Sequence, residues 1–440
     1  MFKNKIITYF IFLTAMIFTQ KAFSQQVKIE RLNLKQCVEI ALKNNPQILA
    51  TKIGVSELKQ KIKEEQSGFY PLVNLNANAG HYNTNVQANL NKGQINDNYM
   101  AGISLHYNLF QGRKAVESVH VARYNYEAGQ LGYISSREDL ILTVVEDYYR
   151  LLQTEHFKSI SEKSLQRAQS HLDFAKALFN NGLASRSDIL KAKTEQSNAK
   201  LDLIHAQNSV LIARGQLNNT LGQNVSSEIK IVDNLEDTIN RSLEHQNKFQ
   251  TLLEEAFKKR PELQKAGVQL QAQKSFIHMA KADYYPGISL DANYNINGGE
   301  VSQLYPSNYI GLGLSFPLFS GFSRPARVSQ EKLQLQVLEQ QRSSLSQQIS
   351  KEVWNAFLAL KEVKERIVNT QVFLKDAREN LNISEGEYKQ DVGSMLDVLD
   401  AETTFVAAEQ SYIVALADLK IAQINLQRAI NGKYFEEILK

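Results

Sequence analysis

The sequence has little proline and cysteine for its length of 440 residues. It contains 7 prolines and a single cysteine, Cys37. One cysteine excludes an intrachain disulfide, and the position of Cys37 on a predicted amphipathic helix indicates a buried thiol. No proline lies between Pro71 and Pro261 or after Pro325. Because proline breaks helices, these long stretches predict helices of unusual length.

Catalytic, metal-binding and phosphate-binding motifs are also missing. The 8 histidines are scattered, and no HExxH or CxxC pattern occurs. The net charge is +4, and the first 24 residues contribute three lysines and no acid, so the remaining chain carries +1. That balance gives no indication of nucleic-acid binding. We therefore predict no enzyme, no cofactor, no metal site and no nucleic-acid partner.

Residues 1–24 have the features of a secretory signal peptide. A basic start precedes an apolar stretch from Ile6 to Phe18, and the small residues Ala22 and Ser24 stand at the predicted cleavage site. No later stretch approaches the roughly 20 apolar residues of a transmembrane helix. If this exported chain enters a membrane, it must therefore do so with strands.

The sequence contains an internal duplication, with residues 30–222 as the first repeat and 248–440 as the second. An offset of 215 relates Tyr70 to Tyr285, and an offset of 209 relates Gly112 to Gly321. The change of offset falls between residues 78 and 109, which predicts a hairpin loop there that is longer in the first repeat. Residues 223–247 are predicted to link the repeats.

Each repeat contains two stretches in which apolar residues alternate with Asn, Ser and Gly. They lie at about 72–80 and 99–109, and at about 287–297 and 308–318. Alternation over this length is typical of an outer-membrane barrel with a wet interior. The alternative is a half-buried sheet of a water-soluble domain. Since four strands cannot close a membrane barrel, the membrane interpretation predicts an obligate oligomer.

The remaining sequence predicts long rods. A helix from Gly112 to Gly182 would be about 100 Å long. Alanine recurs every seven residues from Ala401 to Ala429, with an equivalent series in the first repeat, which predicts close antiparallel coiled-coil packing. The rods are predicted to reverse at tips near 179–188 and 388–397, and each tip offers a serine as the N-cap of the next helix.

Together these features resemble the TolC family of outer-membrane efflux and secretion channels. The residues that carry the resemblance are Asn45-Pro46, Arg260-Pro261, Tyr70-Pro71, Tyr285-Pro286, Asn108–Gly112, Pro317–Gly321, Gly182, Ser185, Asp188 and Leu396–Ala401. The resemblance covers nearly the whole chain after the signal.

The resemblance implies an α+β membrane protein in which a long antiparallel coiled-coil barrel continues a trimeric 12-stranded β-barrel, with four strands from each chain. It implies a passive exit duct in the outer membrane of a Gram-negative bacterium, with a long periplasmic extension. The implied partners are two further copies of the chain, a periplasmic adaptor, an inner-membrane pump and outer-membrane lipid. The outer-membrane component of a type I protein secretion system is the alternative function.

In the family, inward-pointing aspartates close the periplasmic tip, and these match Asp397 and Asp400. Spaced by three residues, they would share a helix face, and a threefold axis would gather six carboxylates, with proton affinity raised by like charge. Ser394-x-x-Asp397 and Ser185-x-x-Asp188 also resemble capping boxes, in which the acid only satisfies backbone N–H groups. Asp400 has no such role.

The resemblance also implies a latch in which Tyr388 contacts Asp188 on the neighbouring hairpin. The predicted tip turns contain Gly182, Ser185, Asp391, Gly393 and Ser394. This chain departs from the family, because Gly393 occupies an arginine position and Asp391 replaces the glycine of the turn.

Two other classes of protein are weighed against the channel. A periplasmic adaptor would have one α-hairpin and a biotin-carrier-like sandwich, whereas this sequence predicts two hairpins and four amphipathic strands. A purely structural coiled-coil spacer would explain the alanine series but not the strands.

Overall fold

The computed structural model describes residues 30–84, 94–232, 235, 248–390 and 392–430. The predicted signal peptide, residues 1–24, lies outside the described residues, as do most of the predicted linker after Val232 and the last residues of the second predicted repeat. Among the described helices, none is both long and apolar enough to cross a membrane.

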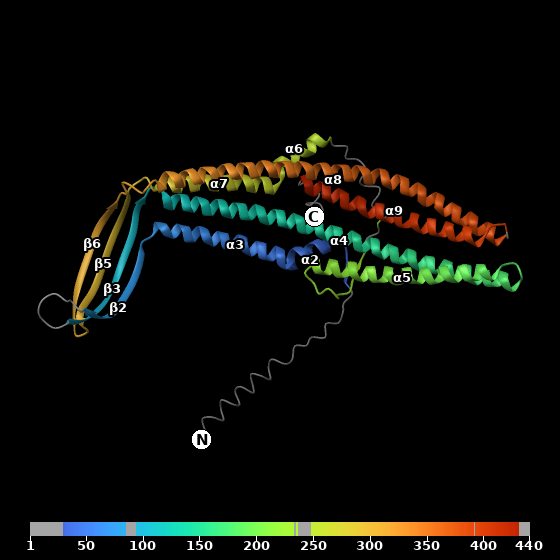
Figure 1. The fold of residues 1–440 in the computed structure, drawn as a ribbon, viewed down its shortest axis with the longest axis horizontal. Helices are drawn as coiled ribbons and strands as arrows, with labels where there is room; N and C mark the ends of the chain where they lie inside the picture. The colour runs from blue at the N-terminus through green and yellow to red at the C-terminus, as the bar shows by residue number, and fades with distance from the viewer. Residues whose placement is uncertain (1–29, 85–93, 233–234, 236–247, 391, 431–440) are drawn as a thin grey trace, which may run out of the picture. The chain divides into compact units, whose positions relative to one another are not determined.

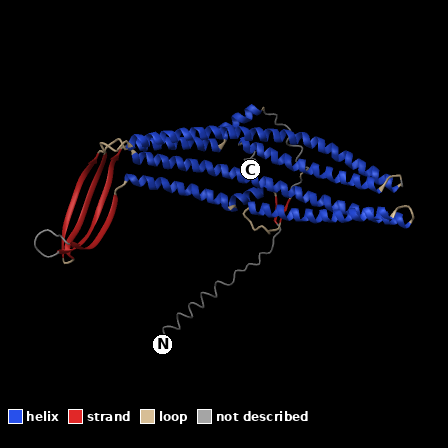
Figure 2. Ribbon diagram, in the orientation of Figure 1, coloured by secondary structure: helices blue, strands red, loops and turns tan. Residues whose placement is uncertain are grey.

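Helices make up most of the described chain (Figure 2). In chain order they are α2 (Leu34–Asn44), α3 (Pro46–Gln66), the 3-10 turn η1 (Ser67–Phe69), α4 (Lys114–Asn180), α5 (Arg186–Thr220), α6 (Phe249–Lys259), α7 (Pro261–Ala282), α8 (Ser323–Lys389) and α9 (Met395–Ile430). The strands are β1 (Glu30–Leu32), β2 (Leu72–Thr84), β3 (Gln94–Gln111), β4 (Ile229–Ile231), β5 (Gly287–Glu300) and β6 (Gln303–Ser315).

The two sequence repeats form equivalent helices and strands. Helices α4 and α8 each contain 67 residues, and the offset of 209 superimposes their ends. The offset of 215 superimposes α2 on α6 and the starts of α3 and β2 on those of α7 and β5. A helix of 67 residues is about 100 Å long, the length predicted for a helix from Gly112 to Gly182.

The described chain divides into two compact units that do not coincide with the predicted repeats. The first contains the described residues within 1–41, 144–241 and 370–417, and the second those within 42–143, 242–369 and 418–440. Each unit therefore takes segments from both repeats. The repeat boundaries near 222 and 248 describe the internal symmetry of the sequence, not separate folding bodies.

The first unit contains a two-stranded parallel sheet and both helical tips. Strand β1 pairs with β4, which joins Leu32 to Ile231 in register. The alanine series behaves differently in its two copies. In α9 the residues Ala401, Ala408 and Ala415 are all buried, whereas in α5 the series is buried at Ala192 but only half-buried at Ala206. The alanine series of α5 is thus less completely buried than that of α9.

The second unit contains a four-stranded antiparallel sheet in the order β2-β3-β5-β6, so β2 and β6 are the edge strands (Figure 1). Thr84 pairs with Gln94, which places the β2–β3 connection at residues 85–93, inside the interval identified by the change of offset. The β5–β6 connection is much shorter, from Glu300 to Gln303. Strand β6 ends at Ser315, which is opposite Gly287, the first residue of β5, and this is short of the predicted end near residue 318.

The strand register gathers the alternating residues on two faces of this sheet. One row across the strands consists of Leu75, Ile103, Tyr294 and, at the β6 edge, Asn308, and a second row consists of Val73, Leu105, Ala292 and Ile310. The opposite face carries rows such as Asn76, Gly102, Asn295 and Ser307. Leu75, Ile103 and Ile310 are exposed in the single chain. The sheet therefore has an apolar face exposed to its surroundings and a polar face of small side chains.

Each long helix begins after two successive residues in the left-handed backbone region. Gly112 and Arg113 have φ values of 59° and 71°, and Gly321 and Phe322 have values of 59° and 63°. The same turn thus leads from β3 into α4 and from the end of β6 into α8. A non-glycine residue in this conformation is strained.

Substituting the first glycine of each turn by alanine is expected to have unequal effects. A Cβ at Gly112 would lie 2.5 Å from the carbonyl oxygen of Ala282, whereas a Cβ at Gly321 would meet nothing within 4 Å. Gly321→Ala should cost about 1 kcal/mol, from backbone strain alone. Gly112→Ala should cost about 3 kcal/mol, because the end of α7 must also move. Thermal unfolding followed by circular dichroism measures both, and equal losses would contradict the predicted clash.

Candidate functional site

The two helical tips are built by equivalent backbone turns. In the first, the amide of Leu183 donates to the carbonyl of Leu178 at 2.9 Å, and Gly182 has a φ of 75°. In the second, the equivalent amide of Val392 donates to the carbonyl of Glu387 at 3.0 Å. Both turns close the C-terminus of one helix as a Schellman-type cap. Asp391, at the position equivalent to Gly182, lies outside the described residues.

Gly393 allows the second turn to fold tightly onto the end of α8. A Cβ at this position would lie 3.0 Å from the Cβ of Glu387 and 3.3 Å from the amide nitrogen of Tyr388. An arginine here, as in the family pattern, would press on the last turn of α8.

Both aspartates of the predicted capping boxes make the capping contacts. The Asp188 carboxylate accepts from the amide of Ser185 at 3.1 Å and from its hydroxyl at 2.7 Å. Asp397 accepts the same two bonds from Ser394 at 3.0 and 2.7 Å. The hydroxyl bond is the main cause that holds the pKa of each carboxyl below its ordinary value. In the single chain these acids therefore stabilise helix starts and remain ionised.

The two tips differ in the charge that follows the cap. In the first, the Lys191 ammonium lies 3.8 Å from the Asp188 carboxylate. At the second, the equivalent position is Asp400, so two carboxylates one helical turn apart follow the turn. The side chains of Asp397 and Asp400 are both exposed. One tip thus carries an ion pair, and the other carries two exposed carboxylates that form no ion pair with any residue that the structure describes.

Tyr388 lies in the small core that joins the two hairpins of the chain. It is 9% exposed, and its ring meets that of Phe174 edge to face with centroids 5.8 Å apart. The core also contains Leu172, Ala175, Ala192, Met395 and Val398. The tyrosine is therefore positioned by packing at the place where the α4–α5 hairpin meets the α8–α9 hairpin.

A buried ion pair behind the tips was not predicted. The Glu402 side chain is 5% exposed, and its two oxygens accept bonds from Nε of Arg167, both at 2.9 Å. The same guanidinium lies 5.2 Å from the ring centroid of Phe405. Loss of either partner would leave a buried charge unpaired, which is destabilising. The ion pair therefore stabilises the packing of α4 against α9. The available signal was a glutamate immediately after the seam residue Ala401.

A second buried charged cluster lies in the other compact unit. Arg428 of α9 is 9% exposed and contacts Glu262 at 2.6 Å and Asp139 at 2.7 Å. Arg260 contacts the same Glu262 at 2.9 Å. Burial would raise the pKa of Glu262, but the bond and the charge of Arg428 lower it to about 2. The cluster fixes the start of α7 against α4 and the end of α9.

Glu138 is the acid of this cluster that is poorly matched by positive charge. Its Oε2 is 3.7 Å from Nη1 of Arg428 and, counting the described residues only, accepts no hydrogen bond. Burial raises the pKa of Glu138 to about 7, and the neighbouring Glu262 and Asp139 add to the rise. This carboxyl therefore titrates near neutral pH.

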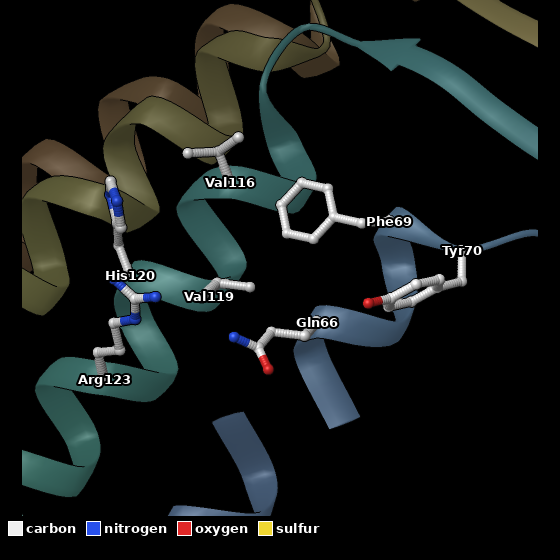
Figure 3. A pocket seen from close by; sticks show the side chains of 7 residues that line it. All are labelled: Gln66, Phe69, Tyr70, Val116, Val119, His120 and Arg123. Carbon is white, nitrogen blue, oxygen red and sulfur yellow. The ribbon is translucent and has the colours of Figure 1, made fainter. Parts of the chain in front are cut away.

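A small hollow of about 290 Å³ lies where the chain passes from α3 toward the sheet (Figure 3). It is lined by Gln66, Phe69, Tyr70, Val116, Val119, His120 and Arg123. The described residues contain no group of three His, Cys, Asp or Glu side chains that could hold a metal ion. The hollow brings together no set of groups with an evident chemical role, so the helical tips remain the candidate functional site.

Known proteins share both the sequence pattern and the fold. The family described as outer membrane efflux protein matches residues 37–223 and 252–432, and the chain belongs to this family. It is an outer-membrane component of an efflux system.

Individual relatives are similar over nearly their whole length. The probable efflux pump outer membrane protein TtgC of Pseudomonas putida is 21% identical, over 92% of this chain and 84% of the relative. The outer membrane protein TolC of Escherichia coli is 23% identical with the same coverage. The CmeC outer membrane channel of Campylobacter jejuni has the same fold, with a TM-score of 0.80 at 16% identity, over 92% of this chain and 89% of the other. The predicted family is confirmed, and so is the predicted combination of long helices with a β-sheet domain.

Proposed function

We propose that three copies of this chain form a passive exit duct through the outer membrane. In this proposal β6 of one copy pairs with β2 of the next, and twelve strands close into a barrel. A sheet with β2 and β6 at its edges supports this, because open edges need partners. The apolar face would meet lipid and the polar face would line the lumen.

Exposed apolar residues on the long helices support the same assembly. On α5 these include Leu201, Ile204 and Leu211, and on α8 they include Val368 and Val372. Rows of this kind on a helix mark surfaces that pack against another chain. In the trimer, α5 and α8 of neighbouring copies would cover these faces, and the helices would continue the duct into the periplasm.

The duct would be closed at the acidic tip and would perform no catalytic step. Asp397 and Asp400 from three chains would form the constriction, where like charge would raise their proton affinity above that of the single chain. A periplasmic adaptor would bind the tips, and an inner-membrane pump would supply energy and choose the substrate. The observation that carries the gate is the exposed acidic pair at one tip of an otherwise duplicated structure.

Single-channel recording tests the proposal. The purified trimer in a planar bilayer should show small, cation-selective currents that divalent cations block. A trimer that inserts into the membrane and conducts no ions would overturn the duct and leave a structural role.

A type I secretion component is the second candidate function, because the same conduit would pass a polypeptide. Deleting the gene should sensitise the cell to toxic small molecules if the duct serves efflux. Unchanged sensitivity together with loss of a secreted protein would favour secretion instead.

Replacing Tyr388 by phenylalanine is expected to raise the leak current of the closed channel. The substitution keeps the ring against Phe174 but removes the hydroxyl that the proposed latch to Asp188 of the neighbouring hairpin uses. Tyr148→Phe is the matched control, since Tyr148 is a fully buried tyrosine of α4 away from the tips. A closed-state leak that is the same in wild type, Tyr388→Phe and Tyr148→Phe would argue against the latch.

A further inference from the structure

The central part of the four-stranded sheet carries four charged or titratable His and Asp side chains, and they form two pairs. Within residues 72–81, 97–111, 287–297 and 305–315 there are two histidines and two aspartates, and no Lys, Arg or Glu. His81 Nδ1 lies 2.6 Å from Asp97 Oδ1, and His106 Nδ1 lies 2.7 Å from Asp291 Oδ1. Both pairs join residues that are directly opposite in the strand register.

The two pairs lie on opposite faces of the sheet. His81 and Asp97 share strand parity with Ala79 and Ile103, which belong to the apolar face. His106 shares parity with Ser104, and its partner Asp291 shares parity with Asn293, which belong to the polar face. Since side chains alternate along a strand, the His106–Asp291 pair is the one charged element of the polar face in these described segments.

The polar-face pair is held by hydrogen bonds from neighbours on its own two strands, β3 and β5. The second ring nitrogen of His106 lies 3.2 Å from Asn108 Oδ1, and the hydroxyl of Ser289 donates to Asp291 Oδ2 at 2.8 Å. On β2, the residue opposite His106 is Leu72, and on β6 the residue opposite Asp291 is Gly311. The imidazole is therefore faced by a single carboxylate and no second acid.

Glycines on β6 leave room beside the Asp291 carboxylate, which the Tyr309 phenol occupies in part. A Cβ at Gly313 would lie 2.8 Å from Ser289 Oγ and 3.6 Å from Asp291 Oδ2, and the site of a Cβ at Gly311 is filled by the Tyr309 phenol. The Asp291 side chain is 42% exposed and that of His106 is 45% exposed. The pair is thus fixed by hydrogen bonds but remains in contact with the space above the polar face.

We propose that His106 and Asp291 set the charge selectivity of the strand-lined part of the duct. This inference rests on the proposed function, in which the polar face lines the lumen. A protonated His106 balances Asp291, so each chain contributes no net charge there. Removing one partner would leave three like charges at one level of the barrel, in a wall of Asn, Ser and Gly that offers no counter-charge.

The experiment measures reversal potentials in a KCl gradient at pH 5.5. An imidazole of ordinary pKa is largely charged at that pH, and an aspartate is ionised. The parent for all variants carries Asp397→Ala and Asp400→Ala, so that the acidic tip does not dominate selectivity. His106→Asn should shift the permeability ratio several-fold toward potassium, and Asp291→Asn should shift it several-fold toward chloride.

Two controls make the result specific. The double variant His106→Asn/Asp291→Asn should return to the parent ratio, because the wall is again neutral. The pair on the opposite face offers a matched control, so His81→Asn and Asp97→Asn should leave selectivity unchanged. Salt should weaken every shift, since the Debye length falls from about 30 Å at 0.01 M to about 3 Å at 1 M.

The outcomes separate this inference from the function on which it rests. Normal conductance with unchanged selectivity in both His106→Asn and Asp291→Asn would overturn the inference and leave the duct intact. Equal shifts in the His81 and Asp97 variants would also overturn it, because the change in selectivity would then not depend on which face of the sheet carries the pair. A membrane-inserted parent trimer that conducts no ions would instead refute the proposed duct.

Discussion

Replacing Asp397 and Asp400 together by alanine is expected to enlarge the single-channel conductance several-fold and to abolish block by divalent cations. Six carboxylates around a threefold axis would attract cations and obstruct a narrow mouth, and the double variant removes all six. Planar-bilayer recording with and without millimolar magnesium measures both effects. Unchanged conductance in the double variant would exclude these residues as the constriction.

The capping role of Asp397 calls for a separate control. Ser394→Ala removes the hydroxyl that bonds Asp397 but leaves both carboxylates, so it should cost about 1 kcal/mol of helix stability and leave the conductance unchanged. Asp400→Asn keeps the size of the side chain and lies outside the cap, so it should give part of the increase. An increase in Ser394→Ala as large as in the double variant would attribute the effect to the turn.

Glu138→Gln is expected to stabilise the protein at pH 8. The pKa of Glu138 in the folded state is about 7, above the ordinary value for glutamate, so the folded state binds more protons than the unfolded state between pH 4.5 and 7. The contribution of the Glu138 carboxyl to the free energy of unfolding is therefore fully present below about pH 4.5 and is lost as pH rises through 7. The loss amounts to about 3 kcal/mol. The glutamine variant should not show this loss, because its side chain does not titrate.

The measurement is the melting temperature by circular dichroism at pH 5 and pH 8. Wild type should melt several degrees lower at pH 8, and Glu138→Gln should reduce this difference. Glu262→Gln is the opposite control. The pKa of Glu262 is about 2, so its contribution is present above about pH 4.5 and is lost as pH falls through 2. That variant should be less stable than wild type at pH 8. A difference between pH 5 and pH 8 that is as large in Glu138→Gln as in wild type would contradict the assignment.

The long elements could be predicted from the sequence because their causes are local and repeated. The scarcity of proline and glycine over α4 and α8 predicts rods, and alternation at Val73, Leu75 and Ala77 predicts a strand with two unlike faces. The duplication strengthens both, since each pattern occurs twice at a fixed offset. The capping residues Ser185 and Ser394 could also be predicted, because a capping box spans only four residues.

The contacts between distant segments could not be predicted in the same way. Glu402 meets Arg167 across 235 positions of sequence, and Arg428 meets Asp139 across 289. A charged residue on a long helix is most often solvated, and nothing local distinguishes these from their neighbours. The pairing of His106 with Asp291 depends on the β3–β5 register, which the sequence does not specify.

The shared left-handed turns before α4 and α8 have a consequence for symmetry. Because the two halves bend in the same way, a ring of three chains would be close to sixfold in its backbone, with six hairpins of one shape. Its charge would not follow that symmetry, since Asp188 with Lys191 and Asp397 with Asp400 would alternate around the rim. A docking protein that binds by shape complementarity would find six equivalent binding sites on the ring. One that binds by charge complementarity would find three.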